Sequence, residues 1–255
     1  ARSFLHALGQ DDEEIARPHV GVFHTGGEMS PCNMNLREQA QHAKTGIYAG
    51  GGMPHECPVV SVSDGLTMAH SGMRFSLISR ELIADSVEAS VRGHQWDGIF
   101  AVGACDKNLP GLMMAMVRLN VPSIFIYGGS ILPGTFKGKP VTVQDVFEAV
   151  GKYSVGAMNE EDLYELESVA CPSSGACGAQ FTANTMATVS EAIGLALPYS
   201  AGAPAPYEIR EQSCRTAGEM IMDLIAKNIR PRDIVTRKAL ENAATVVAAS
   251  GGSTN

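Results

Sequence analysis

The chain has 255 residues, of which 45% are hydrophobic and 18% charged, a composition that excludes disordered and fibrous proteins. Its 27 acidic and 19 basic residues give a formal net charge of −8, which repels phosphate backbones and disfavours nucleic acid as a partner. No uninterrupted apolar run reaches the roughly 20 residues that a membrane span needs. A chain of this length can bury a core without disulfides, so the six cysteines are expected to be core residues, ligands or reactive thiols.

The front part of the chain alternates short apolar runs with segments of helical periodicity. Strands are predicted at 19–24, 58–62, 98–103 and 121–127, and the segments between them fit helices. Such strands are typical of a parallel sheet covered on both faces. In the long helix before the third strand, Leu77, Ile78, Leu82, Ile83 and Val87 are expected to share one face.

Helices dominate after Gly134. Thr142 and Asn159 are predicted to cap two of them, and three more are expected at about 179–196, 210–227 and 236–250. The predicted fold class is therefore α/β: a three-layer α/β/α sandwich with a mainly parallel sheet and a helical C-terminal third.

Four loops carry unusual chemistry. Three follow the predicted strands and contain Ser30-Pro31-Cys32-Asn33, Ser63-Asp64-Gly65 and Ala104-Cys105-Asp106-Lys107. The fourth, 171–178, is rich in glycine and opens a helix. Ligands of open parallel sheets bind where strands end, so these loops are the candidate site.

Cys105, Asp106 and Lys107 place a thiol, a carboxylate and an amine side by side. Soft sulfur and hard oxygen ligands favour different metals, so this loop suggests two inorganic centres. Cys32, Cys105 and Cys177 each lie in a turn before a helix, where backbone N–H groups can support negative charge. The simpler alternatives stay open here: an Asp that caps a helix, an inert cysteine, and an ordinary Asp106–Lys107 ion pair.

Two long segments resemble the motifs of a known family. The segments 104–114 (ACDKNLPGLMM) and 171–186 (CPSSGACGAQFTANTM) resemble those of the dihydroxy-acid dehydratase and phosphogluconate dehydratase family. The Cys32 and Asp64 loops fit as well, and the resemblance extends from near Val20 to Gly251-Gly252-Ser253-Thr254-Asn255. It implies a hydro-lyase that converts a 2,3-dihydroxy acid to a 2-keto acid in valine and isoleucine synthesis. A sugar-acid dehydratase and a non-catalytic metal-binding or dimerisation domain are the alternatives.

The same resemblance implies the ligands. Cys32, Cys105 and Cys177 would hold an iron–sulfur cluster, with [2Fe-2S] favoured over [4Fe-4S]. Asp64 and Asp106 would bind Mg²⁺, and Lys107 would join them as a carbamate. Cys57, Cys171 and Cys214 match no ligand position and are interpreted as packing residues or unreactive thiols.

The resemblance also sets expectations for the wider protein. Residues 1–255 are interpreted as the N-terminal domain, and a C-terminal domain is expected to supply a further Mg²⁺ ligand and the serine base. No catalytic base is therefore assigned in this chain, and the chain alone is expected to be inactive. A small-molecule substrate, a homodimer and a cytoplasmic location are implied. A mitochondrial or plastid location is the alternative, because a transit peptide could have been removed.

Overall fold

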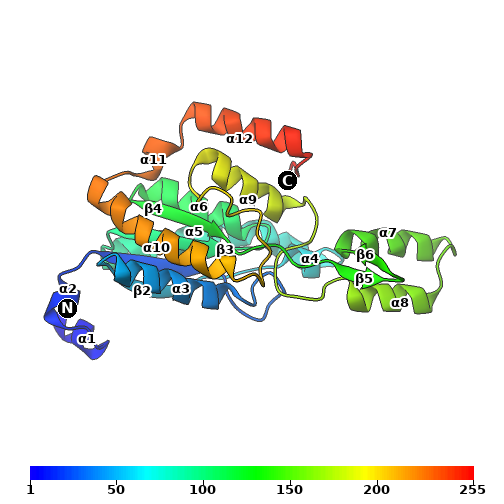
Figure 1. The fold of residues 1–255 in the computed structure, drawn as a ribbon, viewed down its shortest axis with the longest axis horizontal. Helices are drawn as coiled ribbons and strands as arrows, with labels where there is room; N and C mark the ends of the chain where they lie inside the picture. Colours follow the sequence, from blue (N-terminus) through cyan, green and yellow to red (C-terminus); the bar gives the residue numbers. More distant parts are fainter.

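Four parallel strands form the centre of the computed structural model, which describes residues 1–255 (Figure 1). They are β1 (His19–His24), β2 (Met53–Pro58), β3 (Gly98–Gly103) and β4 (Ser123–Tyr127), in the spatial order β2-β1-β3-β4. Strand β3 is buried along its whole length, as is β4. Continuous burial explains why these strands are apolar runs without alternation. The parallel pairing of all four strands confirms the predicted sheet.

Helices cover both faces of the sheet. Helices α3 (Leu36–Ala49) and α10 (Ile209–Lys227) pack together over one face, and α5 (Arg74–His94) and α6 (Asn108–Leu119) pack together over the other. Helix α9 (Thr182–Ile193) lies against α6 and also packs on α12 (Arg237–Ser250). The three-layer arrangement is therefore confirmed.

Five further helices are short. They are α1 (Arg2–Ala7), α2 (Asp12–Ile15), α4 (Asp64–Thr67), the 3₁₀ helix η1 (Ser71–Met73) and α11 (Pro231–Ile234). No helix combines the length and the apolar character required to cross a lipid bilayer.

A small lobe projects from the body (Figure 1). It consists of the antiparallel hairpin β5 (Gly134–Phe136) and β6 (Lys139–Val141), followed by α7 (Val143–Ser154) and α8 (Glu160–Val169). Thr142 and Asn159 cap these two helices as predicted, and each side chain accepts a bond from a first-turn backbone N–H. The hairpin itself was not predicted, because three-residue strands carry almost no periodic pattern.

The second strand differs from the prediction. It was expected at 58–62, whereas the structure places it at Met53–Pro58, paired with β1 from His19↔Met53 to His24↔Pro58. The observed strand contains His55 and Glu56, and only its first residues are buried. An edge strand with polar residues lacks the apolar signal, and the apolar run that follows it is an extended connection leading to Asp64.

Helix α5 also differs in part from the expectation. Ile83 and Val87 are buried, but Leu77, Ile78 and Leu82 are each at least half exposed. Ser76 and Ser79 occupy the buried face in their place, because this helix packs closely against α6 and the Asp64 loop. The apolar periodicity therefore located the helix but not the whole of its buried face.

Stacked aromatic rings occupy the amino edge of the sheet. His55 stacks on His19 and Trp96, and its Nε2 lies 2.7 Å from His19 Nδ1. Burial lowers the pKa of His55 from 6.5 to about 4, and the neighbouring His19 acts in the same direction. The folded protein therefore holds this imidazole neutral at a pH where an unfolded chain would protonate it.

The lowered pKa predicts a pH-dependent stability. Between pH 6.5 and 4 the unfolded chain binds the proton more readily, so the parent should lose stability as the pH falls through this window. His55→Asn should lose less unfolding free energy between pH 7 and 5 than the parent, as measured by urea unfolding. His6→Asn on the exposed helix α1 is the control and should keep the parent's dependence. Equal pH dependence in parent and His55→Asn would contradict the assignment.

Candidate metal and cluster site

Three cysteines from separate loops meet at the carboxyl edge of the sheet. Cys32 lies between β1 and α3, Cys105 directly follows β3, and Cys177 lies between α8 and α9. The Cys105 and Cys177 thiols both lie near enough to Cys32 to shift its pKa, and none of the three forms a disulfide. Cys32 and Cys105 are buried, whereas Cys177 is half-buried. The structure therefore brings together the three residues that the sequence singled out.

The surroundings favour thiolate at two of these cysteines. The neighbouring Cys32 thiol lowers the pKa of Cys105, and the Ser63 hydroxyl and two backbone N–H groups act in the same direction against burial. The Cys32 thiol likewise lowers the pKa of Cys177 to about 7. The neighbouring Cys105 and Cys177 favour the protonated form of Cys32, and with burial they raise its pKa well above the ordinary value. Thiolates that accept several N–H and O–H donors are suited to bind metals.

Backbone hydrogen bonds fix the Cys177 loop to its neighbours. Gly175 N–H donates to Pro31 O at 2.8 Å, and Ala176 N–H donates to Gly129 O at 2.9 Å. Gly175 has a φ of +128°, and a Cβ there would lie 2.4 Å from Ile131 N. Only glycine fits this position without displacing the backbone. The close approach of three chain segments therefore sets the position of Cys177 beside Cys32.

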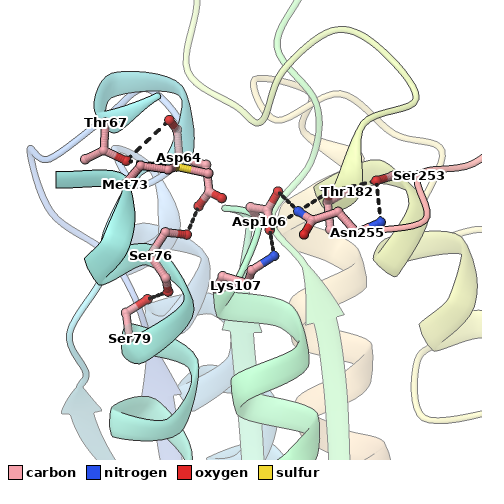
Figure 2. Close-up of polar contacts among 10 residues, drawn as sticks. All are labelled: Asp64, Thr67, Met73, Ser76, Ser79, Asp106, Lys107, Thr182, Ser253 and Asn255. Atoms are coloured by element: carbon pink, nitrogen blue, oxygen red, sulfur yellow. Dashed lines mark hydrogen bonds and ion pairs between the residues drawn. The ribbon is translucent and has the colours of Figure 1, made fainter. Parts of the chain in front are cut away.

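Asp64 begins the short helix α4 and is buried. Its Oδ1 accepts a hydrogen bond from Ser76 Oγ at 2.6 Å, whereas its buried Oδ2 has no hydrogen-bond partner (Figure 2). Burial raises the pKa of this carboxyl, the Ser76 bond opposes that effect, and Asp106 raises the pKa further. A buried carboxylate oxygen without a partner is costly unless a cation compensates it.

Asp106 and Lys107 lie in the turn between β3 and α6. Lys107 Nζ donates to Asp106 Oδ1 at 2.7 Å, and both side chains are largely buried. Figure 2 shows this pair on the loop beside that of Asp64. The charges of Asp106 and Lys107 both influence the Asp64 carboxyl, so the three groups form one electrostatic cluster.

These donors fit the two inorganic centres. Three converging thiols with backbone N–H support suit an iron–sulfur cluster. Two carboxylates, one with an unpartnered buried oxygen, suit a hard divalent cation. Cys105 and Asp106 are adjacent in sequence, so a single loop serves both donor sets.

A buried amide network behind the site was missed by the sequence analysis. The Asn33 side chain is fully buried, and its Nδ2 donates to Thr25 O at 2.6 Å and to Ser61 Oγ at 3.1 Å. Ser61 Oγ in turn donates to Asn108 Oδ1, and Ser30 Oγ donates to Asn33 Oδ1 at 2.6 Å. The network joins the loops that follow β1, β2 and β3. The only sequence signal was the amide next to Cys32 in a strand-end turn.

The other cysteines and histidines lie outside the thiol cluster. Cys214 is buried beside Gln39, and burial raises its pKa to about 12. Cys57 contacts Ser90. Cys171 is exposed as a whole, although partial burial of its thiol raises its pKa. His24 is buried, lies 3.1 Å from Glu56 and accepts a bond from Gly26 N–H. Cys214 therefore contributes to the core, and His24 to the geometry of the loop after β1.

One further group of possible ligands lies elsewhere. Glu38, His42 and Glu211, on α3 and α10, hold their ligand atoms within 4.8 Å of one another. Glu38 is exposed, and His42 and Glu211 are partly exposed. Exposed acidic groups often approach one another without an ion, so no role is assigned to them.

The fold and site together define an α/β domain whose potential inorganic ligands gather at the carboxyl edge of a parallel sheet. Residues 17–255 match the family model described as "Dihydroxy-acid/6-phosphogluconate dehydratase N-terminal". The chain therefore belongs to the dihydroxy-acid/6-phosphogluconate dehydratase family, to its N-terminal region.

Curated relatives resemble the chain over its whole length. It is 69% identical over 254 residues to dihydroxy-acid dehydratase 2 of Bradyrhizobium diazoefficiens. It is 63% identical to dihydroxy-acid dehydratase of Pelagibacter ubique and 62% identical to that of Parvibaculum lavamentivorans. Each comparison covers 100% of this chain and 44% of the relative, so the chain spans less than half of these proteins.

The amide network predicts a stability effect at Asn33. Asn33→Ala would leave buried partners without hydrogen bonds and should lower the unfolding free energy by about 2 kcal/mol. Met34→Ala, at an exposed neighbour, is the matched control and should change it by less than about 0.5 kcal/mol. Urea unfolding measures both variants, and equal losses would show that the network does not hold the loops.

Proposed function

We propose that this chain is the ligand-bearing N-terminal region of a dihydroxy-acid dehydratase of valine and isoleucine biosynthesis. The enzyme would remove the C2 proton and the C3 hydroxyl of a 2,3-dihydroxy acid as water, and the resulting enol would become a 2-keto acid. The main support is the convergence of Cys32, Cys105 and Cys177 beside Asp64 and Asp106. The names of the relatives add to this support.

Each donor set has a proposed occupant. Cys32, Cys105 and Cys177 would hold an iron–sulfur cluster, with [2Fe-2S] favoured, while Asp64 and Asp106 would hold Mg²⁺. Lys107 would join the Mg²⁺ ligands as a carbamate, formed when its neutral amine adds carbon dioxide and releases a proton, because a carbamate offers oxygen ligands where an ammonium would repel the cation. When bound, the two centres would act as Lewis acids for the leaving C3 hydroxyl and for the charge that develops near the substrate carboxylate.

The chain's own residues orient these donors. Ser76 fixes one oxygen of Asp64 and leaves the other free, and before carbamylation the Lys107 amine holds one oxygen of Asp106. Ser63 and the backbone N–H groups of Asp64 and Asp106 stabilise negative charge on Cys105. Burial of these groups limits the access of water, which strengthens every electrostatic interaction in the site.

A sugar-acid dehydratase is the second candidate, because the family description also covers 6-phosphogluconate dehydratase. The names of the relatives favour the dihydroxy-acid enzyme. Keto-acid formation from dihydroxyisovalerate and from aldonates should be compared at the natural full length of the protein. Preference for the aldonates would overturn the proposed substrate.

The thiol cluster predicts the iron content. After anaerobic reconstitution, Cys105→Ser should bind far less iron and acid-labile sulfide than the parent, because a serine hydroxyl is a poor ligand for the cluster. Cys57→Ser makes the same chemical change outside the thiol cluster and should keep the parent's content. Equal iron in Cys105→Ser and parent would refute the ligand assignment.

The unpartnered Asp64 oxygen predicts opposite effects on binding and stability. Asp64→Asn should weaken Mn²⁺ binding at least about tenfold, because it removes an anionic ligand. It should also raise the melting temperature of the metal-free protein, since burial already disfavours the charged carboxylate. Glu167→Gln, an exposed change on α8, controls for the lost charge. Unchanged Mn²⁺ affinity in Asp64→Asn would exclude Asp64 as a ligand.

The wider assembly rests on the family resemblance. The serine base would come from a C-terminal domain, the isolated 255-residue chain would show no turnover, and the natural-length protein would form a homodimer. Turnover by the isolated chain would contradict the first part of this proposal. Light scattering of the natural-length protein tests the proposed homodimer.

A further inference from the structure

The segment Gly251–Asn255 has no role in the proposed function, although it reaches the site. Helix α12 ends at Ser250, and the φ of +62° at the following Gly251 turns the chain back toward α9. A Cβ on Gly252 would lie 2.9 Å from Thr185 Cγ2 and 3.0 Å from Thr185 Oγ1. The first glycine therefore makes the turn, and the second allows the close approach to α9.

Side-chain hydroxyls then fix the segment on the first turns of α9 (Figure 2). Ser253 N–H donates to Thr185 Oγ1 at 2.9 Å, and Ser253 Oγ lies 3.0 Å from Thr182 Oγ1. Asn255 N–H donates to Ser253 Oγ at 3.1 Å. Thr182 is buried, so these bonds anchor the segment on a fixed part of the body.

The anchored segment delivers one amide to the carboxylate of Asp106. Asn255 Nδ2 lies 3.3 Å and 3.4 Å from the two oxygens of Asp106 and 3.2 Å from Thr182 Oγ1. Lys107 Nζ donates to Oδ1 of the same carboxylate. The Asp106 carboxylate is therefore held by two donors, one from its own loop and one from residues nearly 150 positions later in the chain.

We propose that Gly251–Asn255 is a fifth loop of the site and that Asn255 is a positioning residue for Asp106. Groups that donate to a ligating carboxylate orient it and commonly change metal affinity by 10- to 100-fold. The Asn255 amide fixes the Asp106 side chain without adding charge, so the carboxylate keeps its full attraction for a cation. This inference rests on the proposed function, because it takes Asp106 as a ligand of the divalent cation.

Mn²⁺ binding to the natural-length protein tests the proposal, with free Mn²⁺ followed by electron paramagnetic resonance. Asn255→Leu removes the donor at similar size and should weaken Mn²⁺ binding about tenfold. Asn255→Gln keeps an amide and should stay within about threefold of the parent, on the same principle. Thr254→Ala, at the exposed neighbour, is the control and should match the parent.

Iron content separates positioning from general loosening of the site. After anaerobic reconstitution, Asn255→Leu should retain the parent's iron and its melting temperature, because its contacts lie on the carboxylate side. Parental Mn²⁺ affinity in Asn255→Leu, or a parallel loss of iron and Mn²⁺, would overturn the positioning role. In the first case the proposed function stands, provided that Asp64→Asn still weakens Mn²⁺ binding. A parent that binds no Mn²⁺ would overturn the magnesium assignment and this inference together.

Discussion

The site depends on one buried carboxamide, that of Asn33. Its amide and carbonyl contact groups from the loops that follow β1, β2 and β3, so those loops cannot move independently. Each of the three loops carries part of the donor set, in Cys32, Asp64 and Cys105. Such contacts in a water-free interior are strong when complete and costly when broken. The Asn33 amide therefore positions loops that carry two thiols and a carboxylate.

The order of the strands makes this arrangement possible. Because β1 lies between β2 and β3, the carboxyl ends of these three strands are neighbours. The Cys177 loop comes from much later in the chain and reaches the same edge through backbone bonds to Pro31 and Gly129. Pro31 and Gly175, which are more than 140 positions apart, are thus joined by a main-chain bond. The glycine at 175 matters more for this approach than the other side chains of the loop.

Much of the fold could be predicted from the sequence, since strands such as 98–103 are fully buried and therefore continuously apolar. The β2 strand could not, because an edge strand that contains His55 and Glu56 lacks that pattern. The thiol cluster followed from the unusual residues in strand-end loops and from long motifs. The Asn33 network and the approach of Asn255 to Asp106 were invisible, because a single Asn is common in any turn and its partners are set by tertiary structure.

The adjacency of Cys105 and Asp106 has a mechanical consequence. One planar peptide unit separates Cys105, the proposed donor to the soft centre, from Asp106, the proposed donor to the hard one, and that unit is rigid. A shift of the main chain at Cys105 therefore also moves the main chain at Asp106, and a shift at Asp106 moves Cys105. Damage at either centre would spread to the other as a change in geometry. The main chain therefore couples the geometry of the two proposed centres, while each keeps its own set of ligands.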